Sequence, residues 1–339
     1  MIATEKKIYV AVFATLFISC MCAGVYYLAS TRTPQQKVEC DSPRHKKIFI
    51  KGGSFIIGDN SGYPEERVRQ KITLDDFYID KYEVTNAQFS EFVEATGYVT
   101  LAERGLSKEA YPNIDDELLA PGSAVFSPPE QFYSLSNMNW WQFVAGANWR
   151  HPEGPASSIE DREHYPVVHI ALADAKAYAK WKGSELPSEA EWEYAAKAGT
   201  DARYAWGDET YPNDIFMANT WQGRFPVMGT GEDGYQFIAP VGCFPENENG
   251  LLDMIGNVWE WTDDSYLAER KVIQHSHPGN ALEGKIKTGD VEEVHVIKGG
   301  SYLCAQNYCL RYRPAARQPQ ETGLGTNHLG FRTIKRISR

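Results

Sequence analysis

The spacing of apolar residues predicts three short helices, two of them with a residue able to cap the first turn. Thr85 can cap a helix that runs through Glu94 and turns one apolar face inward, formed by Phe89, Phe92 and Val93. A second helix is expected over about 173–182. The third begins at Ser188, which can form a capping box with Glu191.

Short strands alternate with glycine-rich turns in the rest of the chain. Residues 48–58 are typical of two strands around a glycine turn, and further strands are expected at 77–80 and 294–297. From 200 onward the chain is rich in glycine, proline and aromatic residues, with no internal repeat. This pattern predicts one α+β domain with low regular secondary structure, whose buried loops need hydrogen-bond partners or ions.

The N-terminus carries an apolar segment that is separate from this domain. Lys6 and Lys7 precede an uncharged run over 8–29, and a helix of that length extends about 33 Å, enough to cross a bilayer. The lysines predict that the short N-terminus stays in the cytoplasm. We therefore expect a transmembrane signal anchor over 1–30, a linker over 31–45 and a folded domain over 46–337.

Two cleaved forms of this segment are the alternatives. One is an ordinary signal peptide, although no clear cleavage site follows the run, and the other is a lipoprotein processed at Cys20. All three readings place the domain outside the cytoplasm, in the periplasm, at the cell surface or in the ER lumen. Disulfides can form in such compartments.

The net charge of −11 over 339 residues narrows the possible ligands. It argues against a nucleic-acid partner, because binding phosphates needs a basic face. It suits Ca²⁺, which takes carboxylate and carbonyl oxygens, but solubility explains it equally well. Residues 219–223, 231–235 and 253–260 offer such oxygens without the spacing of an EF-hand, so Asx turns and helix caps are the alternative to calcium sites.

Cys304 and Cys309 are the strongest candidates for chemistry in the chain. Two thiols at this spacing can close a small disulfide, hold a soft metal ion or carry out thiol chemistry. In an exported protein the spacing alone favours a structural disulfide.

The residues around these cysteines extend the picture. Residues 186–196 (LPSEAEWEYAA), 256–261 (GNVWEW) and 328–332 (HLGFR) resemble segments shared by the formylglycine-generating enzyme family, also called sulfatase-modifying factors. The resemblance covers roughly 48–334. More specific are four segments that resemble the catalytic branch: 148–155 (NWRHPEGP), 221–226 (WQGRFP), 230–234 (TGEDG) and 299–309 (GGSYLCAQNYC).

The resemblance implies a fold and an activity. The fold is the family's variant of the C-type lectin fold. The activity is oxidation of one cysteine in a Cys-x-Pro-x-Arg motif of an unfolded sulfatase to Cα-formylglycine, with O₂ as oxidant. The implied cofactor is Cu(I) held by Cys304 and Cys309, which agrees with the preference of soft thiolates for this ion.

The resemblance also implies roles for other residues. Ser301, Tyr308 and Trp259 would line the catalytic site, while Glu83 and His328 would contact the substrate, Glu83 through a substrate arginine. Two structural Ca²⁺ ions are implied. The first would be held by Asn219, Thr220, Asp233 and Tyr235, and the second by Asp253, Gly256, Val258 and Glu260.

Some positions depart from the family pattern. Ala305 stands where members carry His, and His328 stands where they often carry Asn, so substrate contacts or rate are expected to differ. Cys40 and Cys243 have no evident partners in the pattern. The alternative function is a non-catalytic, lectin-like protein that binds peptide or glycan, against which retention of both cysteines argues. An iron-dependent sulfoxide synthase is disfavoured because the chain lacks the added helical domain of those enzymes.

Overall fold

The computed structural model describes residues 40, 46–109, 112, 114–132, 134–135, 138–267 and 294–337. The expected anchor at 1–30 lies outside these residues, as does nearly all of the expected linker. Among the helices of the described ranges, none is long and apolar enough to cross a bilayer.

All three predicted helices are present. They are α2 (Asn86–Thr96), α5 (Leu172–Trp181) and α6 (Glu189–Lys197). Thr85 and Ser188 cap α2 and α6 in capping boxes, as their side chains accept main-chain N–H groups in the first turn. Four shorter elements were not predicted from the sequence: α3 (Leu101–Arg104), α4 (Asp116–Leu119) and the 3₁₀ turns η1 (Pro64–Glu66) and η2 (Pro212–Asp214).

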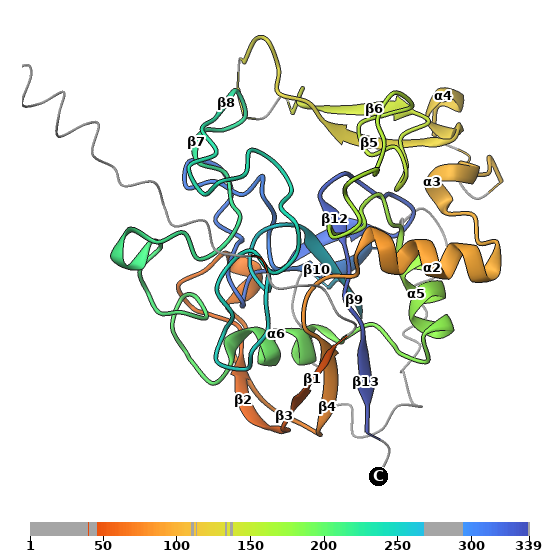
Figure 1. Cartoon of the computed structure of the whole chain (residues 1–339). Coiled ribbons are helices and arrows are strands. Elements are labelled where there is room, and N and C mark those ends of the chain that lie inside the picture. Colours follow the sequence, from red (N-terminus) through yellow and green to blue (C-terminus); the bar gives the residue numbers. More distant parts are fainter. Residues whose placement is uncertain are drawn as a thin grey trace, which may run out of the picture. The chain divides into compact units, whose positions relative to one another are not determined.

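The strands form two small sheets and three hairpins (Figure 1). The larger sheet has the order β11-β10-β9-β12, from Gln318–Glu321, Val294–Lys298, Trp259–Ser265 and Leu329–Gly330. The smaller has the order β1-β4-β13, from Lys47–Ile50, Phe77–Asp80 and Ile334–Arg336. The hairpins are β2 (Gly53–Ile57) with β3 (Gln70–Leu74), β5 (Gly122–Phe126) with β6 (Trp141–Ala145), and β7 (Gly223–Arg224) with β8 (Met228–Gly229).

The strands at 48–58 do not pair with each other. β1 pairs with β4, and β2 pairs with β3, so the chain between β1 and β2 passes from one sheet to another. At Gly52 an added Cβ would lie 2.4 Å from the Leu74 carbonyl oxygen, so this close approach requires glycine. The glycine turn was predicted correctly, while the pairing it implied was not, because pairing depends on strands further along the chain.

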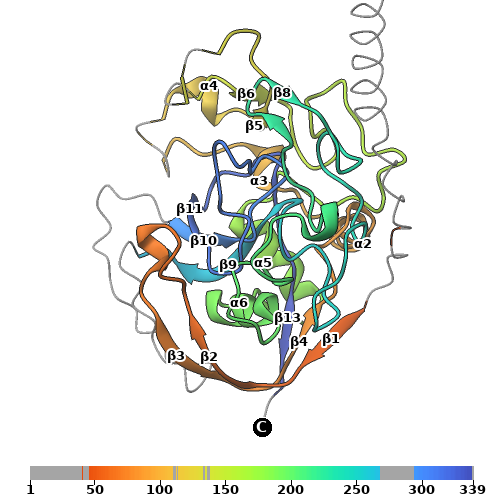
Figure 2. The same ribbon diagram turned by 90° about the vertical axis from the view of Figure 1, so that its left-hand side faces the viewer.

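The main core lies between α2, α5 and the larger sheet. Phe89 of α2 stacks on Tyr178 of α5 with ring centroids 5.9 Å apart, and both contact Phe331 just after β12. Helix α6 contacts β9 and β10, and lies beneath them in both views (Figures 1 and 2). Aromatic packing of this kind compensates for the small share of regular structure.

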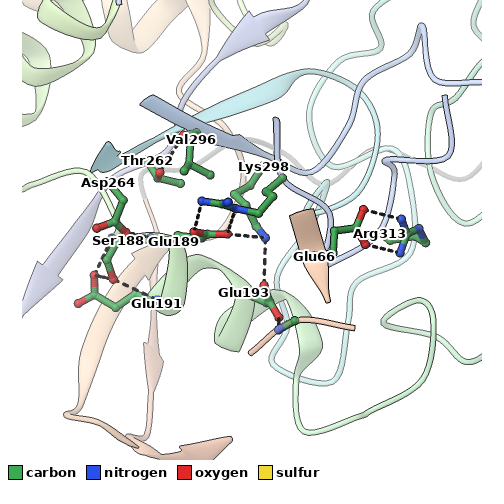
Figure 3. A network of polar contacts seen from close by, with 12 residues as sticks. Glu66, Ser188, Glu189, Glu191, Glu193, Thr262, Asp264, Val296, Lys298 and Arg313 are labelled. Atoms are coloured by element: carbon green, nitrogen blue, oxygen red, sulfur yellow. Dashed lines mark hydrogen bonds and ion pairs between the residues drawn. The ribbon is translucent and has the colours of Figure 1, made fainter. Parts of the chain in front are cut away.

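A buried ion-pair network fastens α6 to the larger sheet, and we call it the α6 clamp: Glu189, Glu193, Lys298 and Arg317. Lys298 Nζ lies 3.0 Å from Glu193 Oε2, and Arg317 Nε lies 2.9 Å from Glu189 Oε1 (Figure 3). Lys298 comes directly before the segment with the two candidate cysteines, and Arg317 follows it. The clamp therefore holds both ends of that segment against α6.

A disulfide joins Cys40 to Cys243, 203 positions further along the chain. Cys243 packs with Ala239 and Phe244, and Tyr235 lies against the same cluster. The sequence offered two unassigned cysteines, and only the folded chain brings them together.

Candidate functional site

The segment that carries the cysteines is a series of tight turns after β10. Gly300 adopts φ 77°, and an added Cβ would lie 2.8 Å from the Cα of Tyr312, so glycine is required here. The Cys304 N–H donates to the Ser301 carbonyl oxygen at 2.9 Å, and the Cys309 N–H donates to the Ala305 carbonyl oxygen at 2.9 Å. These two turns bring the cysteine side chains together.

The two sulfur atoms lie 3.1 Å apart, and both cysteines are free. Cys304 is buried, and burial raises the pKa of its thiol well above the ordinary value. The hydrogen bond from Cys304, helped by Arg311, lowers the pKa of Cys309 to about 7. The pair therefore combines a buried thiol with a partly exposed sulfur that is readily ionised near neutral pH.

Aromatic side chains form a wall beside this dithiol pair. The ring of Tyr308 stacks on Phe225 with centroids 4.3 Å apart, and Trp140 meets Tyr308 edge-on at 5.7 Å. Tyr308 is 37% exposed, whereas Trp140 and Phe225 are buried. The wall thus offers an apolar surface next to Cys309 that is open to solvent at one residue.

The other predicted catalytic residues are buried near the pair. Ser301 is fully buried, and its Oγ accepts the Leu303 N–H at 3.3 Å, so it shapes the first turn. Trp259 lies in the same hydrophobic cluster as Cys304. Both positions are consistent with a role in shaping the site.

His328 packs inside the protein. Its ring lies 4.8 Å from that of Trp141, its Nδ1 contacts the Thr326 hydroxyl, and its carbonyl oxygen accepts the Trp259 N–H at 2.8 Å. Burial lowers the pKa of His328 to about 3, so the ring is neutral. His328 therefore acts on the site through Trp259 and Trp141, and the described conformation leaves little of it exposed to a substrate.

Glu83 does not lie where the resemblance implied. It is fully buried and accepts a hydrogen bond from the Asn257 amide at 3.2 Å, while its other carboxylate oxygen has no hydrogen-bond partner among the described residues. A carboxylate enclosed in this way is not available to a substrate arginine. The expectation of substrate contact is corrected on this ground.

Glu83 instead belongs to a group of buried charges, which we call the carboxylate cluster: Glu83, Asp253, Glu260 and Arg332. Arg332 pairs with Glu260 through two bonds of 2.7 Å, and the Trp192 Nε1–H donates to the same carboxylate. Burial, reinforced by Asp253, raises the pKa of Glu83, and burial raises that of Asp253 to about 6. Three carboxylates facing one guanidinium leave an excess of negative charge.

Three of the four residues expected at the second calcium site lie next to this cluster or within it. Asp253 accepts the Gly242 N–H at 2.5 Å, whereas both oxygens of Glu260 receive hydrogen bonds. Gly256 approaches so closely that an added Cβ would lie 2.2 Å from the Asn219 carbonyl oxygen. The fourth residue, Val258, is buried. The excess negative charge and the convergent oxygens fit a hard cation.

At the first expected calcium site, Asp233 is the charged group. Its carboxylate accepts the Thr220 N–H at 3.3 Å and the Tyr235 N–H at 3.0 Å, together with the Gln222 amide at 2.9 Å. Burial raises the pKa of Asp233 to about 6. Asn219 turns its amide nitrogen away, to Asn257 and Phe237, so the site brings three of its four expected residues together and links the fourth to the carboxylate cluster.

Two parts of this region could not be found from the sequence. Asn257 connects the two expected calcium sites through Asn219 and Glu83, and Arg332 is the counter-ion of Glu260. Within the described ranges, no three His, Cys, Asp or Glu side chains converge as a metal centre. A metal at the dithiol pair would therefore have two protein sulfur ligands.

Comparisons with known proteins agree with this architecture. The family described as "Sulfatase-modifying factor enzyme 1-like domain" matches residues 32–337. A formylglycine-generating enzyme of Mycobacterium tuberculosis is 48% identical over 291 residues, covering 85% of this chain and 96% of that protein. A Bos taurus protein named inactive C-alpha-formylglycine-generating enzyme 2 is 39% identical over 299 residues, covering 86% and 88%.

A solved structure, PvdO from Pseudomonas aeruginosa, shares the fold with a TM-score of 0.56 at 22% identity, covering 86% of this chain and 94% of that one. Because the family match spans 32–337 and relatives reach this identity over most of their length, the chain belongs to the sulfatase-modifying factor family.

Proposed function

We propose that this protein matures sulfatases by converting a cysteine of the unfolded polypeptide to Cα-formylglycine. The observation that carries the proposal is the free Cys304–Cys309 pair, with sulfurs 3.1 Å apart beside an apolar wall. Relatives named formylglycine-generating enzymes match most of the chain, which supports the same reaction class.

In the finer proposal the two cysteines hold Cu(I), and the target cysteine lies in a Cys-x-Pro-x-Arg motif. Two soft thiolates are the protein donors that this ion prefers. When bound, the metal would supply O₂ activation. Converting CH₂–SH to CHO with loss of sulfide releases two electrons, whereas reduction of O₂ to water takes four, so an external thiol supplies the other two.

The chain's own side chains would bind and orient the substrate. The wall of Tyr308, Phe225 and Trp140 can pack against the peptide next to its cysteine and keep water from the sulfurs. Ser301 and Trp259 hold the turn and the floor beneath Cys304. Ala305 leaves open the space that a larger side chain would fill, and we expect the substrate motif to reflect that difference.

The remaining parts of the proposal are supports for this site. Two Ca²⁺ ions would stabilise the loops around Asp233 and Asp253, where burial has already raised both carboxyl pKa values. The C-type lectin variant would be the scaffold, and the apolar run at 8–29 would anchor it to a membrane with the domain outside the cytoplasm.

A direct assay tests the reaction. The full-length protein, loaded with Cu(I), is incubated under air with a thiol reductant and a Cys-x-Pro-x-Arg peptide, and the peptide is followed by mass spectrometry. We expect conversion of cysteine to formylglycine, its loss in Cys304→Ser and Cys309→Ser, and its retention in Lys176→Met, which changes an exposed ion pair.

The second candidate is a non-catalytic protein that binds peptide or glycan. It is kept because one relative of 39% identity is named inactive, so family membership alone does not decide the activity. A copper-loaded protein that binds the peptide and leaves it unchanged would favour this candidate.

A further inference from the structure

The chain around η1 lies against the residues that follow Cys309, although almost 250 positions separate them. The Leu310 N–H donates to the Tyr63 hydroxyl at 3.2 Å, and Arg311 Nη2 lies 2.6 Å from Glu65 Oε1. Arg313 forms a two-bond pair with Glu66, each bond 2.8 Å long (Figure 3). This contact fixes the outgoing side of the dithiol pair.

Within this contact the guanidinium of Arg311 is held on two sides. Glu65 binds one terminal nitrogen, and the ring of Tyr63 lies under the guanidinium carbon at 4.0 Å. The third donor, the Nε–H, is buried and has no hydrogen-bond partner among the described residues. A buried donor without an acceptor costs stability, so its retention points to an acceptor that is added when the site is loaded.

Arg311 also acts on the two sulfurs. Its guanidinium and its main-chain N–H both favour the charged form of Cys309, and its charge favours that of Cys304. Two thiolates around a monovalent cation keep one net negative charge, and a substrate thiolate would add a second. Negative charge in a buried place is unfavourable unless a cation or a donor offsets it.

We propose that Arg311 is a positioning residue of the dithiol site, oriented by Glu65 and Tyr63. Its charge offsets that of the metal-bound thiolates, and its Nε–H is the donor to their sulfur. The inference rests on the proposed function, because it concerns the ion that Cys304 and Cys309 would hold. It adds to that function a third participant and its two supports, which come from the far end of the domain sequence.

The test measures Cu(I) affinity without turnover. Wild type, Arg311→Gln and Arg311→Lys compete anaerobically with a bathocuproine chelator for Cu(I), and thermal unfolding confirms that each variant is folded. A unit charge a few ångströms from the ion pair predicts that Arg311→Gln binds Cu(I) roughly 10- to 100-fold more weakly. Arg311→Lys keeps the charge but not the fixed Nε–H, so its affinity should lie between the two.

Arg67→Gln is the matched control. It removes an exposed arginine with the same charge change from the same segment, and its Cu(I) affinity should equal that of wild type. Addition of ethylguanidinium to Arg311→Ala should restore part of the lost affinity, which a purely structural role would not allow.

The outcomes separate the two proposals. Strong binding by wild type and equal binding by Arg311→Gln would overturn the role of Arg311 alone. Failure of wild type to bind Cu(I) would overturn the copper site and this role with it. Should Arg311→Gln not fold, Arg311→Lys carries the test, and an affinity equal to that of wild type would overturn the donor role.

Discussion

Two groups of buried charged side chains in this protein differ in the balance of their charges. In the α6 clamp, Lys298 and Arg317 match Glu189 and Glu193, with ion-pair distances of 2.9 and 3.0 Å. In the carboxylate cluster, Arg332 pairs with Glu260 and leaves Glu83 and Asp253 without a cation of their own. Both groups lie in the same fold and are equally removed from water.

The difference separates a structural device from a candidate ion site. Buried pairs with good geometry cost little once they are formed, and removing one partner is what destabilises the protein. Unmatched carboxylates are unfavourable from the start unless a proton or a metal ion neutralises them. The balance of charge is thus the property that experiments can break in one region and correct in the other.

Breaking the clamp gives the largest expected effect. Lys298→Met leaves buried carboxylates with one cation fewer, and we expect the free energy of unfolding to fall by about 3–5 kcal/mol, measured by urea denaturation. Lys176→Met is the control, since its pair with Asp263 is about half exposed and should contribute only about 0–1 kcal/mol. Equal losses in the two variants would contradict the role of the clamp.

Calcium should act on the unbalanced regions and leave the clamp unaffected. At a hundred times its dissociation constant, Ca²⁺ should raise the free energy of unfolding by about 2.7 kcal/mol, and EGTA should reverse this. Asp253→Asn should reduce the response to calcium and yet be no less stable than wild type in EGTA, because one repelling charge is gone. Lys298→Met should keep the full response; a response lost in Lys298→Met and intact in Asp253→Asn would refute the comparison.

Protons should replace the missing cation at low pH. Burial raises the pKa of Asp253 from 3.8 to about 6, so the folded protein binds this proton more tightly than the unfolded chain. The resulting stability is complete below about pH 4 and is lost as the pH rises through about 6. In EGTA we expect a loss of about 2 kcal/mol over this range, measured by urea denaturation at each pH. The loss should shrink in Asp253→Asn and in saturating calcium.

The helix caps give the smallest expected effect. Ser188 caps the helix of the clamp, and Thr85 caps the helix that follows Glu83, so replacing either by alanine should cost about 1 kcal/mol. Only Ser188→Ala should be non-additive with Lys298→Met, by more than about 0.5 kcal/mol in a double-mutant cycle. Equal coupling for Thr85→Ala would show that the clamp is not a local unit.

What the sequence predicted well depends on neighbours in the chain. The capped starts of α2 and α6 and the glycine turn at 52–53 follow from residues within a few positions of one another. The positions of Cys304 and Cys309 were also visible, because two short turns govern their approach. Local spacing was sufficient in each case.

The features that were missed depend on residues far apart in the sequence. β1 and β2 were expected around one turn, but their partners are supplied by later strands. Glu83 was assigned to the substrate, and its burial beside Asp253 could not be deduced without the fold. The pairing of Arg311 with Glu65 was invisible for the same reason.

The bond between Cys40 and Cys243 turns two-thirds of the domain into a covalent ring. In the chain-entropy treatment, closing a ring of this size stabilises the folded state by about 5 kcal/mol. The ring also governs what a protease can release. A single cut between the two cysteines leaves both fragments joined, so the product keeps its full mass on a gel until a reductant opens the ring.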